Sequence, residues 1–205
     1  MCVAIYKPKD CEITVKRLKE AYEANPDGCG LLYAVNGRLC AIKGCYDFDK
    51  FYKNYQIAAS SLRDVIIHFR TASSGGISDE NCHPFFVNND LAFVENGNLF
   101  ELTNFFESFP DNKTDVVRFN EQILKRLPQD FLRNNEIRSV FEEYCLANFT
   151  KMIFMDASGQ VNIVNEEAGE WVNGCWYSNG GIENYIGYGY SGAYYYKASD
   201  IRHKG

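Results

Sequence analysis

The order in which strand-like and helix-like segments follow one another constrains this chain most strongly. Alternating or short apolar runs, typical of β-strands, occupy residues 3–6, 30–35, 38–46, 65–70, 91–95, 152–156 and 160–164. Asn36-Gly37, between the second and third runs, is a favoured two-residue hairpin turn. Because several strands follow each other without an intervening helix, antiparallel sheets are favoured over a doubly wound parallel sheet.

Helical periodicity supplies the other half of the fold prediction. Apolar residues recur at a spacing of three to four in segments 14–24, 48–60, 114–126 and 136–147. Such amphipathic helices can cover the sheets, so the sequence predicts an α+β fold. The chain has 205 residues, enough for one compact unit with a sizeable core, and no linker or repeat divides it.

We therefore expect a single domain over residues 1–205 that ends in a Tyr- and Gly-rich segment at about 187–205. Part of this segment reads GYGYSGAYYY and is the one strongly biased stretch of the chain. A terminal strand or tail is the favoured interpretation, and a docking surface for a partner is the alternative.

Composition and charge exclude several classes of function. Apolar residues make up 46% of the chain, as in globular proteins, and the formal net charge is −6. A clustered basic face for nucleic acid is therefore not expected. The N-terminus lacks the apolar run of a secretory signal, and no segment approaches the roughly 20 apolar residues that span a membrane. We expect a cytoplasmic protein without a nucleic-acid or membrane partner.

The eight cysteines and three histidines follow no metal-binding pattern. No Cys-x-x-Cys pair occurs, so a structural zinc site is not expected. Disulfides are disfavoured in a reducing cytoplasm, and most of the thiols are expected to be small buried hydrophobic groups. The sequence therefore predicts neither a metal nor another cofactor.

Cys2 is the first candidate for chemistry. Removal of Met1 would place a thiol and a free α-amine on the same residue. Their reference pKa values, about 8.5 and about 7.7–8.0, are close enough for proton exchange near neutral pH, so the amine could act as the base. A cysteine in the second position is more often incidental, so this interpretation needs support from the rest of the chain.

Three further motifs provide that support, although each also has an ordinary structural interpretation. The turn NPDGCG at 25–30 suits a close backbone approach to a ligand or simply a tight turn. Arg70 ends an apolar strand before a loop of small and hydroxyl residues. Its guanidinium could bind a carboxylate under a closing loop or form a surface ion pair. Asn96-Gly97 could supply two oxyanion donors or a hairpin turn, whereas His83 is expected to be structural.

Taken together and in this order, the motifs resemble those of the class II glutamine amidotransferases, a family of N-terminal nucleophile hydrolases. The matching positions are Met1-Cys2, Asp27-Gly28-x-Gly30, His68-x-Arg70-x-Ala72-Ser73-x-Gly75, Asn81-x-His83-Pro84, Asn96-Gly97 and Thr114-Asp115. The resemblance covers about the first 120 residues closely. Residues 156–165 and 176–179 match the family's later strands and closing turn with lower specificity.

The resemblance implies a four-layer αββα sandwich, and it implies roles for particular residues. Cys2 would be the nucleophile and base, Asn96 and Gly97 would form the oxyanion hole, and a γ-glutamyl thioester would be the intermediate. The residues implied in glutamine binding are Arg70 for the α-carboxylate, Asp115 for the α-ammonium, Ser73 through its hydroxyl and Gly28 through its backbone. The released ammonia is expected to pass to a synthetase that is a separate protein.

Some positions depart from the family pattern and keep other functions open. Glu95 stands where a histidine commonly precedes Asn-Gly, and Thr71 and Ser74 replace bulkier residues. One alternative is an N-terminal nucleophile amidase that acts on another amide or a γ-glutamyl compound. Another is a non-catalytic module of the same fold, which retention of Met1 would favour because it blocks the amine.

Overall fold

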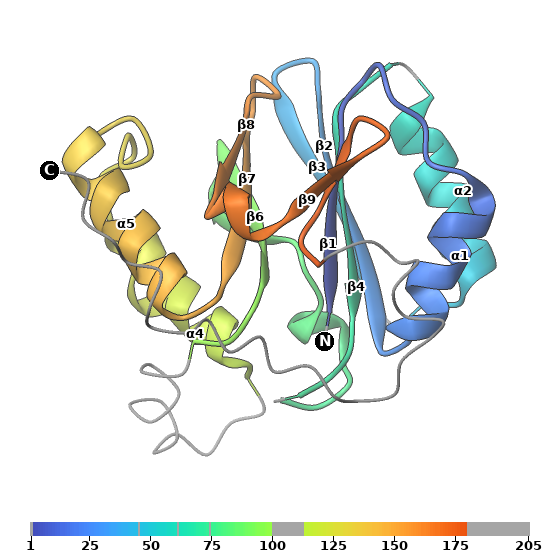
Figure 1. The fold of residues 1–205 in the computed structure, drawn as a ribbon, viewed down its shortest axis with the longest axis horizontal. Helices are drawn as coiled ribbons and strands as arrows, with labels where there is room; N and C mark the ends of the chain where they lie inside the picture. Colours follow the sequence, from blue (N-terminus) through green and yellow to red (C-terminus); the bar gives the residue numbers. More distant parts are fainter. Residues whose placement is uncertain (1, 45, 61, 74, 100–112, 180–205) are drawn as a thin grey trace, which may run out of the picture.

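A computed structural model of the chain describes residues 2–44, 46–60, 62–73, 75–99 and 113–179. Figure 1 shows four layers, in which two facing sheets are each covered on the outer side by helices. Helices α1 and α2 cover one sheet, and α4 and α5 cover the other. The predicted αββα sandwich is therefore confirmed. The Tyr- and Gly-rich segment at 187–205 and Met1 lie outside the described residues.

The first sheet contains six strands in the order β3-β2-β4-β1-β10-β9, and all neighbours are antiparallel. Its strands are β1 (Val3–Lys7), β2 (Gly28–Val35), β3 (Arg38–Gly44), β4 (Val65–Arg70), β9 (Glu170–Val172) and β10 (Cys175–Tyr177). Asn36 and Gly37 form the predicted β2–β3 turn, with φ values of 51° and 72°. The last strands of the described chain thus lie beside the first.

The second sheet contains four antiparallel strands in the order β5-β6-β7-β8. They are β5 (Phe85–Asn88), β6 (Leu91–Asn96), β7 (Lys151–Asp156) and β8 (Val161–Val164). Strands β6 and β7 run the full length of the sheet, since Leu91 pairs with Asp156 and Asn96 pairs with Lys151. These two pairs mark the two ends of the sheet.

The α-helices of the described residues begin at side-chain caps. They are α1 (Val15–Ala24), α2 (Phe48–Ala59), α4 (Asp115–Gln122) and α5 (Asn135–Ala147). Thr14, Asp47, Thr114 and Asn134 each accept a hydrogen bond from an N–H of the first turn, which fixes where the helices start. The predicted helix 114–126 is too long, because the backbone leaves helical geometry at Ile123 and continues as a short 3-10 turn.

The pattern of apolar residues did not predict strands β5, β9 and β10. Each has only three or four residues, too few for alternation to be visible. Only the resemblance pointed to a strand near Trp176. That side chain is fully buried between the two sheets and belongs to the same apolar cluster as Leu32 and Ile66.

Strand alternation determines which side chains face the layer between the sheets. Ala4, Leu32, Ile66, Val94 and Trp176 fill this layer. The intervening residues of these strands pack instead against the helices, in separate apolar clusters. Among the described residues, no helix combines the length and apolarity that crossing a membrane requires.

Candidate active site

The residues of the candidate site lie where several central strands of the two sheets end. Alternation along each strand places them on the face that, farther along the strand, lines the apolar layer between the sheets. These residues are Cys2, Gly28, His68, Arg70, Asn96 and Ser178. Arg70 and Asn96 are 4% exposed and Ser178 is 1% exposed. Burial of so many polar groups requires a hydrogen-bond network, and the structure contains one.

The Cys2 thiol lies against the backbone that follows β4. Thr71 N–H donates to Cys2 Sγ at 3.3 Å, and Sγ lies 3.4 Å from the Thr71 carbonyl oxygen. Burial raises the pKa of the Cys2 thiol, while the Thr71 N–H and the Arg70 charge oppose the rise. The thiol is therefore protonated at neutral pH, and nucleophilic attack requires a base.

Two residues next to β10 connect Asn96 to the start of the chain. Asn96 Nδ2 donates to Ser178 Oγ at 2.6 Å and to Asn179 Oδ1 at 2.9 Å. Asn179 Nδ2 in turn donates to the Cys2 carbonyl oxygen at 2.7 Å, and Ser178 Oγ accepts from the Ala4 N–H at 2.9 Å. Both amide hydrogens of Asn96 are thus engaged, and a single residue links it to Cys2.

Arg70 lies at the end of β4, opposite Gly28 of β2. Its Nη1 donates to the Gly76 carbonyl oxygen at 3.2 Å, which draws the loop after β4 over the strand end. A Cβ atom at Gly28 would overlap Cys82 Sγ, so the backbone approaches this side chain as only glycine allows.

The first part of the loop after β4 is tied to the NPDG turn. Thr71 Oγ1 donates to Asn25 Oδ1 at 2.8 Å, and Ala72 N–H donates to Asp27 Oδ2 at 2.8 Å. The Asp27 N–H returns a bond to the Arg70 carbonyl oxygen at 2.9 Å. Ser73, by contrast, is exposed, and no hydrogen bond within the described residues involves its side chain.

Gly97, directly after β6, and Asp115, at the start of α4, lie beside this region. Asp115 begins α4, and its Oδ2 accepts from the Leu99 N–H at 3.2 Å. Gly97 packs against Thr150, whose backbone and side chain a Cβ atom at Gly97 would overlap. The structure therefore brings Cys2, Asn96 and Arg70 together at one end, with Gly97 and Asp115 alongside.

The two buried histidines are poor candidates for the base. Their ring centroids lie 4.2 Å apart. Burial lowers the pKa of His68 to about 3, and Arg70 adds to the effect. Burial and the neighbouring His68 also lower the pKa of His83. Both rings are therefore neutral and weakly basic.

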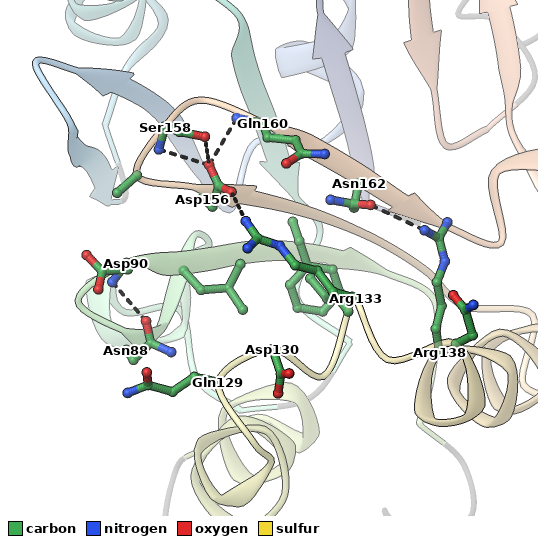
Figure 2. Close-up of a pocket in the computed structure, with 15 residues that line it drawn as sticks. Asn88, Asp90, Gln129, Asp130, Arg133, Arg138, Asp156, Ser158, Gln160 and Asn162 are labelled. Atoms are coloured by element: carbon green, nitrogen blue, oxygen red, sulfur yellow. Dashed lines mark hydrogen bonds and ion pairs between the residues drawn. The ribbon is translucent and has the colours of Figure 1, made fainter.

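A cleft of about 600 Å³ lies at the other end of β6, and its lining includes Leu91. Figure 2 shows the polar side chains around it, among them Arg133, Arg138 and Asp156. Arg133 lies 3.7 Å from Asp156, and Arg138 donates to Asn162 at 3.4 Å. The lining contains neither cysteine nor histidine. Within the described part of the chain, no cluster of three or more His, Cys, Asp or Glu is arranged to hold a metal ion. The region around Cys2 is therefore the better candidate active site.

Sequence reasoning missed Ser178 and Asn179 as site residues. The resemblance placed a closing turn there, but neither residue was connected with Asn96. Their signal was available only as a Ser-Asn pair directly after a short aromatic run. Thr71 was likewise treated as a departure from the family pattern, whereas its backbone contacts the Cys2 thiol.

Comparisons with known proteins agree with this geometry. The family model described as glutamine amidotransferases class-II matches residues 47–174. Glutamine phosphoribosylpyrophosphate amidotransferase from B. subtilis, solved with ADP and GMP, is 19% identical with a TM-score of 0.52. The alignment covers 86% of this chain but 41% of that enzyme, so the chain spans less than half its length. This likeness supports the fold.

Two other solved structures align less well. A glutamine aminotransferase class-II domain protein from Silicibacter pomeroyi is 17% identical, with a TM-score of 0.39 and coverage of 77% of this chain and 73% of that one. The allosteric regulatory enzyme of purine biosynthesis is 18% identical, with a TM-score of 0.47 and coverage of 86% and 41%. No curated protein sequence matches the chain. From the family match over 47–174, the chain belongs to the class II glutamine amidotransferases.

Proposed function

We propose that this chain hydrolyses glutamine to glutamate and ammonia through a thioester on Cys2. Members of its family use glutamine and pass the ammonia to an acceptor domain or protein. The observation that carries the proposal is the position of the Cys2 thiol. The thiol sulfur accepts a hydrogen bond from the Thr71 N–H, directly after β4. Beside it, Asn179 links the Cys2 carbonyl oxygen to the Asn96 amide.

Opposite charges would hold the amino-acid head group of glutamine. In this proposal the Arg70 guanidinium binds the α-carboxylate and the Asp115 carboxylate binds the α-ammonium. Gly28 contributes backbone close to the nucleophile, and the exposed hydroxyl of Ser73 joins the site from the loop. Fixing both charged ends places the side-chain amide at the thiol and lowers the entropic barrier to attack.

The base is the α-amine of Cys2 after removal of Met1, since the thiol is protonated and the histidines are weak bases. The amine takes the thiol proton as Sγ attacks the amide carbon, and it returns this proton to the departing ammonia. Water then hydrolyses the thioester to glutamate, which restores the thiol.

The tetrahedral oxyanion would accept hydrogen bonds from Asn96 Nδ2 and the Gly97 N–H. Both hydrogens of Asn96 Nδ2 are engaged with Ser178 and Asn179. Catalysis therefore requires Asn96 to exchange one of these partners for the oxyanion. Asn179, which also holds the Cys2 carbonyl, is the partner whose release would couple this rearrangement to the nucleophile.

We propose further that the ammonia passes to a synthetase that is a separate protein. The alignment with the B. subtilis enzyme covers 41% of that enzyme. The cytoplasm is the proposed location, because its reducing conditions keep the Cys2 thiol available.

The proposal is tested by intact-mass analysis of the natively expressed protein, followed by an assay of glutamate release from glutamine. We expect loss of Met1 and glutamate release in the wild type, no release in Cys2→Ala, and near-normal release in the control Cys40→Ala. Hydrolysis of a γ-glutamyl compound but not glutamine would support the amidase alternative. Retention of Met1 without any turnover would support a non-catalytic module.

A further inference from the structure

Glu95 lies directly before the Asn96-Gly97 pair but faces the opposite side of the sheet. On β6, Val94 belongs to the layer between the sheets, whereas Phe93 belongs to the cluster beneath α4 and α5. Alternation places Glu95 on the same side as Phe93, and its side chain is buried with the residue 7% exposed. It therefore stands behind the proposed oxyanion hole and not in the substrate site.

The Glu95 carboxyl is bound to a residue that is itself firmly held. Thr150 Oγ1 donates to Glu95 Oε1 at 2.5 Å. The Thr150 N–H donates to the Cys145 carbonyl oxygen at 3.0 Å, and its carbonyl oxygen accepts from Asn165 Nδ2 at 2.9 Å. Thr150 is 0% exposed, so its position is determined on several sides.

The same threonine forms the surface on which Gly97 packs. A Cβ atom at Gly97 would overlap the Cα, Cβ and Oγ1 atoms of Thr150. The hydroxyl that binds Glu95 is thus also one of the atoms nearest to Gly97. We infer that Glu95 is a positioning residue, which holds the Gly97 N–H in place for the oxyanion through its hydrogen bond to Thr150. This inference rests on the proposed function.

The charged groups around Glu95 agree with such a role. Asp115 approaches from α4, Lys151 from β7 and Cys145 from α5. Burial raises the pKa of Glu95 to about 8, and Asp115 adds to the rise. At neutral pH the carboxyl is mostly uncharged, so it can hold Thr150 without placing a negative charge behind the developing oxyanion.

The test compares variants that keep or remove the Glu95–Thr150 hydrogen bond. Glu95→Gln and Thr150→Ser retain it, Glu95→Ala and Thr150→Val remove it, and Glu143→Gln changes an exposed carboxyl of α5 as a control. At neutral pH we expect kcat for glutamine to fall by roughly tenfold to 100-fold in the two variants without the bond. We expect KM within about twofold of wild type and no change in the other three variants, because head-group binding is untouched.

A second readout does not depend on turnover. The backbone order parameter of Gly97, from ¹⁵N relaxation, should fall in Glu95→Ala and Thr150→Val and stay unchanged in Cys2→Ala and Glu143→Gln. If the wild type showed no hydrolysis but Gly97 followed this pattern, the proposed function would fail while the positioning contact stood. An unchanged kcat and an unchanged Gly97 order parameter in Thr150→Val would overturn the inference.

Discussion

The two ends of the sandwich hold their polar groups in different ways. At the Cys2 end, partners come from distant parts of the chain. Asn96 is 82 positions from Ser178 and 83 from Asn179, and Asn179 is 177 positions from Cys2. These bonds form only when both sheets and the last strands are in place.

At the end with the cleft, the side chains of Asp156 and Asn88 accept from N–H groups of their own turns, and the Arg138–Asn162 contact, which spans 24 positions, is the longer-range exception among the bonds named here. Asp156 Oδ1 accepts from Ser158 N–H at 2.9 Å and from Gln160 N–H at 3.1 Å, and Asn88 Oδ1 accepts from Asp90 N–H at 2.8 Å (Figure 2). Such bonds stabilise turns wherever they occur in a protein. A polar group that is buried and held by distant partners is therefore the better indicator of function here, since ordinary turn formation does not explain it.

The largest expected effect is the loss of Asn96. Asn96→Ala should lower kcat for glutamine by roughly 100-fold or more, because one oxyanion donor is removed. Asn162→Ala, which removes an amide at the cleft end, should leave kcat within about twofold. Steady-state kinetics on both variants decides this, and an Asn96→Ala enzyme with near-normal turnover would remove that residue from the mechanism.

Arg70 should show the next largest effect. Arg70→Lys keeps the charge but loses the planar fork, so we expect KM for glutamine to rise by roughly tenfold to 100-fold. The matched control is Arg133→Lys at the cleft end, for which no change in KM is expected. Equal KM values for the two variants would argue against recognition of the α-carboxylate by Arg70.

The third prediction concerns the buried Glu95 carboxyl at the Cys2 end, whose titration should make the stability of the protein depend on pH. The pKa of Glu95 is about 8 in the folded state against an ordinary value of 4.5. Between these two pH values the folded state binds more protons than the unfolded state. The stabilisation that the protonated Glu95 carboxyl contributes is therefore fully present below pH 4.5 and is lost as pH rises to 8. We expect the free energy of unfolding to fall by up to about 1.4 kcal/mol per pH unit relative to Glu95→Gln.

Urea denaturation of wild type and Glu95→Gln at several pH values between 5 and 8 measures this difference directly. The comparison with Glu95→Gln cancels the titration of the two histidines, which is common to both proteins. If the difference in free energy of unfolding stayed constant across this pH range, Glu95 would be ionised throughout in the folded protein. Its side chain would then be better hydrated than its burial indicates.

The smallest effect should come from the turn at the cleft end. Asp156→Ala removes the local acceptor of the β7–β8 turn and should lower the free energy of unfolding by about 1 kcal/mol. Turnover of glutamine should stay unchanged, because the contact does not reach Asn96. A marked loss of kcat in this variant would contradict the separation of the two ends and would assign the cleft a part in the reaction.

Most of the architecture was predictable because it depends on local pattern. The strand ending at Arg70 and the β2–β3 turn at Asn36-Gly37 agree with their predicted positions. The helix predicted to reach residue 126 and the unpredicted β9 and β10 show the limit. The end of a helix and the pairing of a three-residue strand depend on tertiary contacts that a local pattern does not contain.

The candidate site was predictable to a smaller extent. Motifs identified Cys2, Arg70 and Asn96. In the structure these residues lie next to β1, β4 and β6, at the same end of the two sheets. They did not identify Asn179, because its partners are 83 and 177 positions away and its local sequence is that of any polar turn. They also gave no account of Glu95, whose role depends on which side of the sheet it faces.

The position of β10 beside β1 has a consequence for how the protein is made. Cys2 leaves the ribosome 177 positions before Asn179, which holds its carbonyl. At about 5–20 residues per second this interval is roughly 10 to 35 seconds. Throughout that time the Cys2 carbonyl lacks the partner that holds it in the finished fold, although β4, which pairs with β1, is made much earlier.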